Sequence, residues 1–392
     1  MKVAFVSESL PPAKTGQAMV LSRLLGGWSP SDYCLLSAQA QGAEAGTLPA
    51  GTYALGQPPL LGRGYRYGLT YPREAFDVAR GVRARAAEIA EVLRRERCDA
   101  VVACTGDLLD LPAACLAAGR ARVPFYAYVF DHYSYREWRE PARRFWAARM
   151  EPWVLKRAAR VIVPNEVLRD DLRRRYRVEP AVIYNSFDLT PYAGADGDPP
   201  PGGGGGRIVY TGDIYEAHYD AFRNLLDALE RPGLEALSLH AYTPRTAEEL
   251  ARAGVRGEKL VLHAPRSPSE IPGIQRGAEF LFLPLAFKSP YPELVRTSAT
   301  TKMGEYMAAR RPVLVHAPEG SFVSWYFREH GCGVVVDRDD PEALARALTS
   351  VLGDEELRRA MVERGWERVQ SDFRVESARE KFMEVLAVGA AR

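Results

Sequence analysis

The chain has 392 residues, of which 47% are hydrophobic and 26% charged, and its formal net charge at pH 7 is +2. This is the composition of an ordinary globular protein, and so balanced a charge argues against a nucleic-acid binder with a basic surface. The length exceeds that of one ordinary core and predicts two domains.

Cysteine usage and apolar run lengths bear on the compartment. The five cysteines lack CxxC spacing and lie mostly in apolar runs, so we expect buried thiols in a reducing environment. No run approaches the roughly 18 uninterrupted apolar residues of a membrane span, and the N-terminus has no signal-peptide pattern. We therefore expect a cytoplasmic protein, with a peripheral contact at the inner face of the membrane left open.

In the first half, short apolar runs alternate with longer amphipathic segments. Strands are expected at KVAFVSES, YCLLSA, DAVVACTG, PFYAYVFD, RVIVPN and AVIYNSFD. Helices are expected from about Gly16 and over 74–95, 108–120, 137–157 and 166–177. Continuous apolar strands separated by helices predict a parallel sheet covered on both faces, here in an N-terminal domain over 1–190.

Pro and Gly runs in 191–206 predict a linker, after which the alternation restarts. Strands are expected at RIVYTGD, ALSLHAY, KLVLHAP, EFLFLPLAF, PVLVHAP and CGVVVD, which predicts a second doubly wound α/β domain over 207–374. The last helix, over 375–392, is expected to pack back toward the N-terminal domain. Because such sheets bind ligands at the carboxyl ends of their strands, we expect a site in a cleft between the domains.

The stretch TSATTKMGEYMAARRPVLV places hydroxyl groups, one lysine and one carboxylate around the start of a short helix. Ser298, Thr300 and Thr301 can donate hydrogen bonds to a phosphate near the helix N-terminus. Lys302 adds a point charge there, and Glu305 can accept hydrogen bonds from both hydroxyls of a ribose. The pattern predicts a nucleoside-diphosphate site. The plainer alternative is that Thr300 caps the helix and Glu305 is a first-turn acid.

Several segments together resemble the retaining glycosyltransferases of family 4, which have the GT-B fold. MGEYMAARRPVLV matches the family's glutamate, short helix and G-R/K-P-V strand, and ARVIVPNEVLRDDLRRRY with VIYNSFDL resembles the end of its first domain. PPAKTGQAMVLSRLL resembles its P-x-x-G-G loop, and SFVSWYFREHGCGVVVD a further stretch of its donor domain. The resemblance covers nearly the whole chain. It implies two Rossmann-like domains facing a central cleft, with Glu305 on the donor ribose.

The chain departs from the family pattern at two positions. Many members have a second glutamate eight residues before the ribose ligand, where this chain has Thr297, and Glu293 is a candidate substitute. Members also carry an Arg after the first strand of the donor domain and a Lys shortly beyond it, whereas Asp213 stands at the Arg position here. Charge on the diphosphate is therefore expected from Lys302, Lys288, Lys14 or Arg296, since lysines are few in this arginine-rich chain and three of them fall in loops on the expected cleft.

Other residues follow strands of the expected sheets. Gly16 is assigned to the donor site because a missing side chain lets a ligand approach the backbone; the alternative is a turn glycine with positive φ. Gly212, after the first strand of the second domain, is included in the same site. Asp131 and His132 end the strand PFYAYVFD. With Lys302 they are the candidate catalytic residues, although Asp131 could merely cap a turn.

His263 and Arg266, in KLVLHAPRSP, are placed beside the nucleotide base, with a plain surface loop as the alternative. His218 is a weaker candidate. Six scattered histidines give no spacing for a metal site, and no cofactor is expected other than the donor substrate.

Two stretches are candidates for contact with the acceptor. LLGRGYRYGLTYPRE interleaves tyrosines with arginines, which suits sugar stacking, an anionic group or a rigid surface loop. Residues 136–157 carry Trp138, Trp146 and Trp153 with several arginines, compatible with a membrane-surface helix or, more simply, with burial of the rings against the sheet.

We therefore expect a metal-independent, retaining glycosyltransferase whose donor is a UDP- or GDP-sugar. Its acceptor would be a carbohydrate, a lipid-linked molecule or a small molecule. The rival hypotheses are a nucleotide-sugar epimerase or phosphorylase, and a non-catalytic nucleotide-sugar-binding protein.

Overall fold

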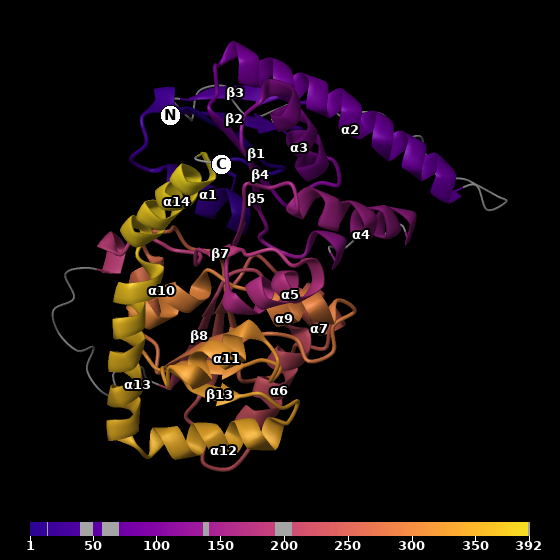
Figure 1. Cartoon of the computed structure of the whole chain (residues 1–392). Helices are drawn as coiled ribbons and strands as arrows, with labels where there is room; N and C mark the ends of the chain where they lie inside the picture. The colour runs from indigo at the N-terminus through magenta and orange to yellow at the C-terminus, as the bar shows by residue number, and fades with distance from the viewer. Residues whose placement is uncertain (14, 40–49, 57–69, 136–140, 193–205, 391–392) are drawn as a thin grey trace. The chain divides into compact units, whose positions relative to one another are not determined.

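The computed structural model describes residues 1–13, 15–39, 50–56, 70–135, 141–192 and 206–390 (Figure 1). The chain divides into two compact units. The first comprises Met1–Tyr184 with Ala378–Arg392, and the second is Asn185–Ser377. Each unit contains one sheet whose strands all pair in parallel, which confirms the predicted class of two doubly wound α/β domains.

The first unit has a seven-stranded sheet in the order β3-β2-β1-β4-β5-β6-β7. Its strands are β1 (Val3–Val6), β2 (Tyr33–Ser37), β3 (Gly51–Ala54), β4 (Ala100–Cys104), β5 (Phe125–Tyr128), β6 (Arg160–Val163) and β7 (Ala181–Val182). Its helices are α1 (Gly16–Leu25), α2 (Thr70–Arg95), α3 (Asp110–Ala121), α4 (Pro141–Leu155) and α5 (Glu166–Tyr176), together with most of α14 (Val375–Ala390).

Both faces of this sheet are buried, which explains why its strands are continuously apolar. Alternate residues of β1 enter different cores: Ala4 and Val6 pack into one hydrophobic cluster, and Val3 and Phe5 into another. A strand buried on both faces has no position at which a polar side chain reaches water. The sequence analysis did not predict the edge strand β3, which is mostly exposed and not apolar.

Helix α14 completes the first unit from Ala378 onward. Its buried Phe382 and Leu386 join the same cluster as Phe5. Arg379 donates to the carbonyl oxygen of Arg23 at the end of α1 at 2.7 and 2.9 Å, so a second, polar contact secures the helix.

The second unit has a six-stranded sheet in the order β10-β9-β8-β11-β12-β13. Its strands are β8 (Arg207–Thr211), β9 (Ser238–Tyr242), β10 (Leu260–His263), β11 (Phe280–Pro284), β12 (Val313–His316) and β13 (Val334–Val336). Its helices are α6 (Tyr219–Leu229), α7 (Ala247–Arg252), α8 (Ile271–Arg276), α9 (Pro292–Thr297), α10 (Lys302–Ala308), α11 (Phe322–Glu329), α12 (Pro341–Leu352) and α13 (Glu355–Arg368), followed by a π-helical turn over Val369–Phe373.

The second unit begins at Asn185, in a segment that the sequence analysis placed in the first domain. Phe187 explains this position, because its backbone N–H donates to the carbonyl of Phe373 at 3.0 Å and its ring packs against Gly304 of α10. No helix in the described part of the chain is long and apolar enough to cross a membrane.

Replacing Phe382 with alanine is expected to destabilise the first unit. Its ring is 1% exposed and lies 6.1 Å from the ring of Phe5 and 6.3 Å from that of Tyr128 (centroid distances). Loss of so large a buried side chain should lower the free energy of unfolding by about 3–5 kcal/mol, measured by urea denaturation. Met383→Ala, at a neighbouring position that is 42% exposed, should change it by less than about 0.5 kcal/mol. Equal effects of the two substitutions would contradict the docking of α14 through Phe382.

Candidate functional site

In the second unit, the loops that follow β8, β9 and β10 are joined at the carboxyl edge of the sheet. The backbone N–H of Gly212 donates to the carbonyl of Tyr242 at 2.9 Å, and that of Thr243 donates to the carbonyl of His263 at 3.1 Å. Gly212 has φ of +134°, which disfavours any other residue. Such an edge is where open parallel sheets bind ligands.

The side chain of Lys302 lies against Gly212. A methyl group at Gly212 would come within 2.7 Å of Lys302 Cε and 2.9 Å of Nζ, so the missing side chain makes room for the lysine. Nζ also lies 5.3 Å from the centroid of the Tyr210 ring, a cation–π contact. Burial lowers the pKa of Lys302, against the opposing effect of Glu305 and Asp213. Lys302 is half-buried and forms no ion pair with a described residue.

Three contacts fix the start of α10, and the first of them joins the helix to the end of β8. The hydroxyl of Tyr306 accepts a hydrogen bond from the backbone N–H of Thr211 at 3.1 Å. Asn185 Nδ2 donates to the carbonyl of Ala299 at 2.7 Å and fixes the preceding loop. Gly304 is packed so closely against Phe187 that a methyl group would lie 2.5 Å from the ring. The packing of α10 therefore sets where Lys302 can reach.

The hydroxyl residues before α10 are placed differently from one another. Ser298, Thr300 and Thr301 are half-buried in the loop between α9 and α10, and the Thr300 hydroxyl accepts a long 3.4 Å hydrogen bond from the Lys302 N–H. Thr301, the residue before the helix, makes no side-chain cap. Thr297 is fully buried, and its hydroxyl donates to the Glu293 carbonyl at 2.9 Å, within its own helix.

Glu305 is half-buried one turn into α10, and its charge acts on Lys302. The structure therefore brings together Gly212, Lys302 and Glu305, three of the residues that the sequence assigned to the donor.

Two other candidate cations for the diphosphate, Lys288 and Arg296, are already paired with acids. Lys288 Nζ lies 2.7 Å from Asp339 Oδ2, and Arg296 forms a 3.0 Å ion pair with Glu293. Sequence reasoning missed Arg245, which forms a bidentate ion pair with Asp213. Its Nε donates to Oδ1 at 2.6 Å and its Nη2 to Oδ2 at 2.8 Å. Asp213, the acid at the family's Arg position, is thus neutralised by an arginine from the loop after β9. Arg245 is recognised as part of this site only from its contact with Asp213 in another loop, which the spacing of residues in the sequence does not reveal.

The histidines near this edge are held by aromatic neighbours. The ring of His263 stacks on Tyr242 with centroids 4.3 Å apart, and its Nε2 lies 3.0 Å from Nδ1 of His240. His218 is 7% exposed; burial and the nearby Lys302 lower the pKa of His218 to about 3, so it is neutral at physiological pH. Arg266 is exposed, 4.0 Å from Glu270.

The remaining predicted residues belong to the first unit. Gly16 is the first residue of α1 and does not have positive φ; the Thr15 hydroxyl caps this helix by accepting from the Ala18 N–H at 3.3 Å. His132 is fully buried, with Nε2 3.2 Å from Asp171 Oδ2, whereas Asp131 is exposed. Burial of His132 beside a carboxylate gives it a structural partner inside the unit.

Some predicted features lie outside the described residues, namely Lys14, Trp138 and most of the tyrosine–arginine loop. Trp146 and Trp153 are half-buried, and Trp153 packs against the core. In the described residues, no three His, Cys, Asp or Glu side chains are grouped to hold a metal ion.

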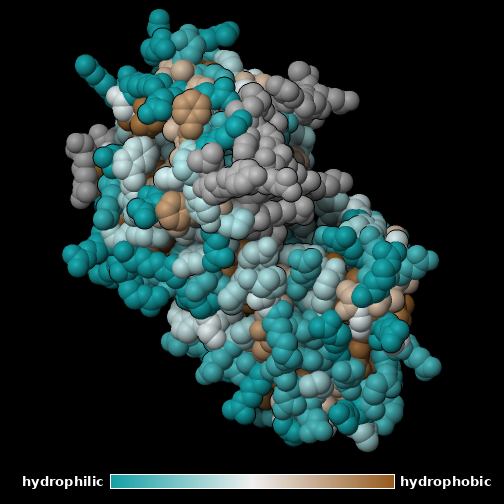
Figure 2. All heavy atoms as spheres, turned by 90° about the vertical axis from the view of Figure 1, so that its right-hand side faces the viewer, coloured by the Kyte–Doolittle hydropathy of each residue, from teal (hydrophilic) through white to brown (hydrophobic). Residues whose placement is uncertain are grey.

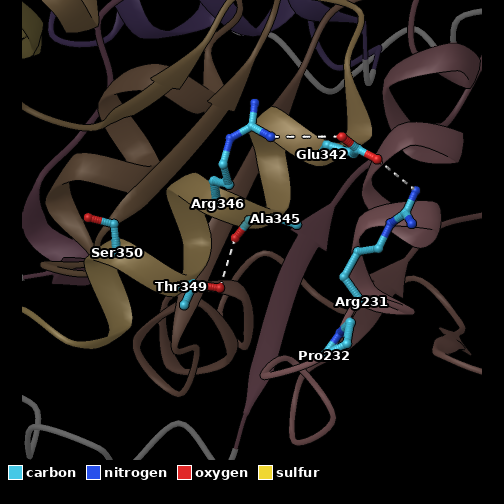
Figure 3. A pocket seen from close by; sticks show the side chains of 7 residues that line it. All are labelled: Arg231, Pro232, Glu342, Ala345, Arg346, Thr349 and Ser350. Carbon is cyan, nitrogen blue, oxygen red and sulfur yellow. Dashed lines mark hydrogen bonds and ion pairs between the residues drawn. The ribbon is translucent and has the colours of Figure 1, made fainter.

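A hollow of about 470 Å³ lies elsewhere in the second unit, between the end of α6 and one face of α12 (Figure 3). Glu342 lies between Arg231 and Arg346 at its rim, at 3.7 and 3.9 Å. None of the predicted donor residues lines it.

Two family models match the sequence. The model "Glycosyltransferase Family 4" matches residues 48–190, and "Glycosyl transferases group 1" matches residues 300–368, which include Lys302 and Glu305. A curated relative, the lipopolysaccharide core biosynthesis glycosyltransferase LpsE of Rhizobium meliloti, is 32% identical over 83 residues. That stretch is 21% of this chain and 24% of the relative's length.

Solved structures resemble the chain over nearly its full length. Anabaena Alr3699/HepE, in a complex with UDP, has a TM-score of 0.69 at 15% identity and covers 99% of this chain and 100% of its own. Sucrose-phosphate synthase from Thermosynechococcus elongatus has a TM-score of 0.64 at 15% identity, with 98% of both chains covered. The chain has the GT-B fold. Glycosyltransferase models thus match parts of both halves of a GT-B chain, as the sequence led us to expect.

Replacing Lys302 with methionine is expected to leave the ligand-free protein as stable as the wild type or more so. The substitution keeps the apolar stem and removes an ammonium whose pKa burial lowers. The pKa of Lys302 in the folded protein lies below the unfolded value of 10.5, so the wild type gains stability as pH rises between these two pKa values. The difference in stability between Lys302→Met and the wild type should therefore narrow toward pH 10.5. Thermal unfolding at several pH values measures this. A clear loss of stability in Lys302→Met at neutral pH would contradict the account of a desolvated, unpaired ammonium.

Proposed function

We propose that the protein is a retaining, family 4 glycosyltransferase that moves a sugar from a nucleoside-diphosphate sugar to an acceptor hydroxyl. One observation carries the proposal: a lysine without an ion-pair partner among the described residues lies at the carboxyl edge of the second sheet, beside a glycine that makes room for it. Desolvating a half-buried ammonium that has no ion-pair partner among the described residues costs folding free energy, so its presence is best explained by an anionic ligand. The group 1 glycosyltransferase model covers this lysine.

The residues of this edge would divide the work. Lys302 would bind the diphosphate and stabilise its charge as the bond to the sugar breaks, which is electrostatic catalysis by a preorganised group. Glu305, near enough to act on Lys302, would accept hydrogen bonds from the ribose hydroxyls. Arg245, in the loop after β9, would supply a further cation, and the diphosphate would compete with Asp213 for it. Phosphate neutralisation is thus assigned to side chains, without a metal ion.

The donor is proposed to be a UDP-sugar. The solved structures of HepE contain UDP, UDP with glucose, and UDP-glucose, and that protein has the same fold over its full length. The acceptor, a carbohydrate, lipid-linked or small molecule, would be bound by the first unit, and localisation in the cytoplasm belongs to the same proposal.

A non-catalytic nucleotide-sugar-binding protein is the rival that particular residues favour. Thr297 is fully buried and bonded within its helix, so its hydroxyl does not replace the family's sugar-binding glutamate. Release of nucleoside diphosphate from the donor in the presence of acceptor distinguishes the transferase from this rival. An epimerase would instead convert donor without acceptor.

Calorimetric titration with UDP and with uridine separates the two assigned roles. Lys302→Met should weaken UDP binding by about 100-fold and leave uridine binding nearly unchanged, since a charge-assisted hydrogen bond to phosphate contributes about 1.5–3 kcal/mol. Glu305→Gln should weaken the binding of both UDP and uridine. The binding of 2′-deoxyuridine diphosphate should change less with this substitution. Glu342→Gln, which alters a carboxylate paired with Arg231 and Arg346 away from this edge, serves as the matched control. Equal losses of UDP and uridine in Lys302→Met would refute the phosphate assignment.

Donor affinity is also expected to depend on pH. Bound diphosphate favours the charged ammonium and raises the pKa of Lys302 above its lowered value in the free protein. The UDP dissociation constant should therefore increase as pH rises through the free-state pKa, and Lys302→Arg should lose this dependence because arginine remains protonated. Titrations at a series of alkaline pH values provide the measurement. If the dissociation constant depends on pH equally in the wild type and in Lys302→Arg, the pH dependence comes from another group.

A further inference from the structure

Exposed aromatic rings gather on two adjoining helices of the first unit. Among the described residues, five aromatic side chains are exposed, and three of them, Tyr71, Phe76 and Phe145, lie on α2 and α4. Their exposed fractions are 44%, 66% and 40%. Figure 2 shows the face toward which the first turns of these helices point, and apolar rings interrupt the hydrophilic surface in its upper half. Rings of this size are normally buried, so their concentration at one place calls for a partner.

The first turns of α2 and α4 form one continuous surface. The rings of Tyr71 and Phe145 meet edge to face with centroids 5.6 Å apart, and Trp146 Nε1 donates to the Tyr71 carbonyl at 3.1 Å. Arg143 Nε donates a hydrogen bond to Glu74 Oε1 at 2.8 Å across the same junction between the two helices. We name this surface the aromatic–arginine patch and define it by Tyr71, Arg73, Phe76, Arg80, Arg144, Phe145 and Arg149.

The exposed charges of the patch are all positive. Arg73 and Arg80 flank Phe76 at helical spacing on α2, and Arg144 and Arg149 flank Phe145 on α4; all four arginines are exposed. Arg149 lies over the Phe145 ring at 5.0 Å, and neither Arg144 nor Arg149 forms an ion pair with a described residue. The two acids in these turns contribute little outward charge, because Glu74 is bonded to Arg143 and Asp77 is 3% exposed.

We propose that the aromatic–arginine patch binds the surface of an anionic phospholipid bilayer. Aromatic rings prefer the interface between headgroups and acyl chains, and arginines at their edges meet lipid phosphates while their stems cover apolar surface. A polyanion such as RNA would use the arginines but leaves exposed phenylalanines unexplained, and a second copy of the chain would bring arginine against arginine. The patch lies on the described part of α2 and α4, and the proposal does not depend on the transferase assignment.

Vesicle flotation of the full chain tests the proposal. Vesicles that contain phosphatidylglycerol should carry the protein upward, and vesicles of phosphatidylcholine alone should not. Arg144→Gln with Arg149→Gln should weaken partitioning by about 25-fold, roughly fivefold for each arginine near an anionic surface. Phe76→Ser with Phe145→Ser should weaken it by on the order of tenfold through lost apolar burial.

Matched variants in other helices control for charge and hydrophobicity. Arg252→Gln with Arg346→Gln removes two exposed arginines of the second unit, and Leu357→Ser with Met383→Ser removes two exposed apolar side chains; neither pair should alter flotation. The proposal fails if the wild type does not float with anionic vesicles, or if controls and patch variants lose binding equally. It also fails if the patch variants instead abolish RNA retention on filters or dissociate a dimer in sedimentation, with flotation unchanged.

Discussion

The proposed binding site depends on the position of one ammonium group, that of Lys302. Lys302 is held over Gly212 and the ring of Tyr210, and it has no ion-pair partner in the described chain. Two other features of the second unit allow Lys302 to occupy this position. Gly212 has no side chain where the lysine lies, and Tyr306 bonds the end of β8 so that α10 begins beside it. Stability alone does not explain an arrangement that desolvates a charge, whereas an anionic ligand does.

The first unit is organised around a different constraint, a sheet buried on both faces. Its inner strands are apolar along nearly their whole length, so polar groups collect at strand ends and in loops. His132 follows β5 and is buried against Asp171, and Arg85 of α2 lies between Asp107 and the fully buried Asp110. These pairs fix loops at the carboxyl edge of the sheet. The outer surface of α2 and α4 carries aromatic rings and exposed arginines instead, which is why a binding role is assigned there.

The fold was predictable because apolar strands buried on both faces leave a pattern that needs no contact information. The site was predictable only in part. A lysine at the start of a helix near a family motif marked Lys302, but spacing could not show that Lys288 would be paired with Asp339 or Arg296 with Glu293. Arg245 was missed because its partner Asp213 lies in another loop, and β3 because an exposed edge strand carries no apolar run. Pairing in space decides which charges remain available to a ligand.

A crystal structure of the complex with UDP would show which groups of the protein bind the diphosphate. We expect Lys302 Nζ within about 3 Å of a phosphate oxygen, with the Glu305 carboxylate on the ribose hydroxyls. UDP bound with its diphosphate away from Lys302, while the ammonium stays over Gly212, would contradict the role proposed for this lysine.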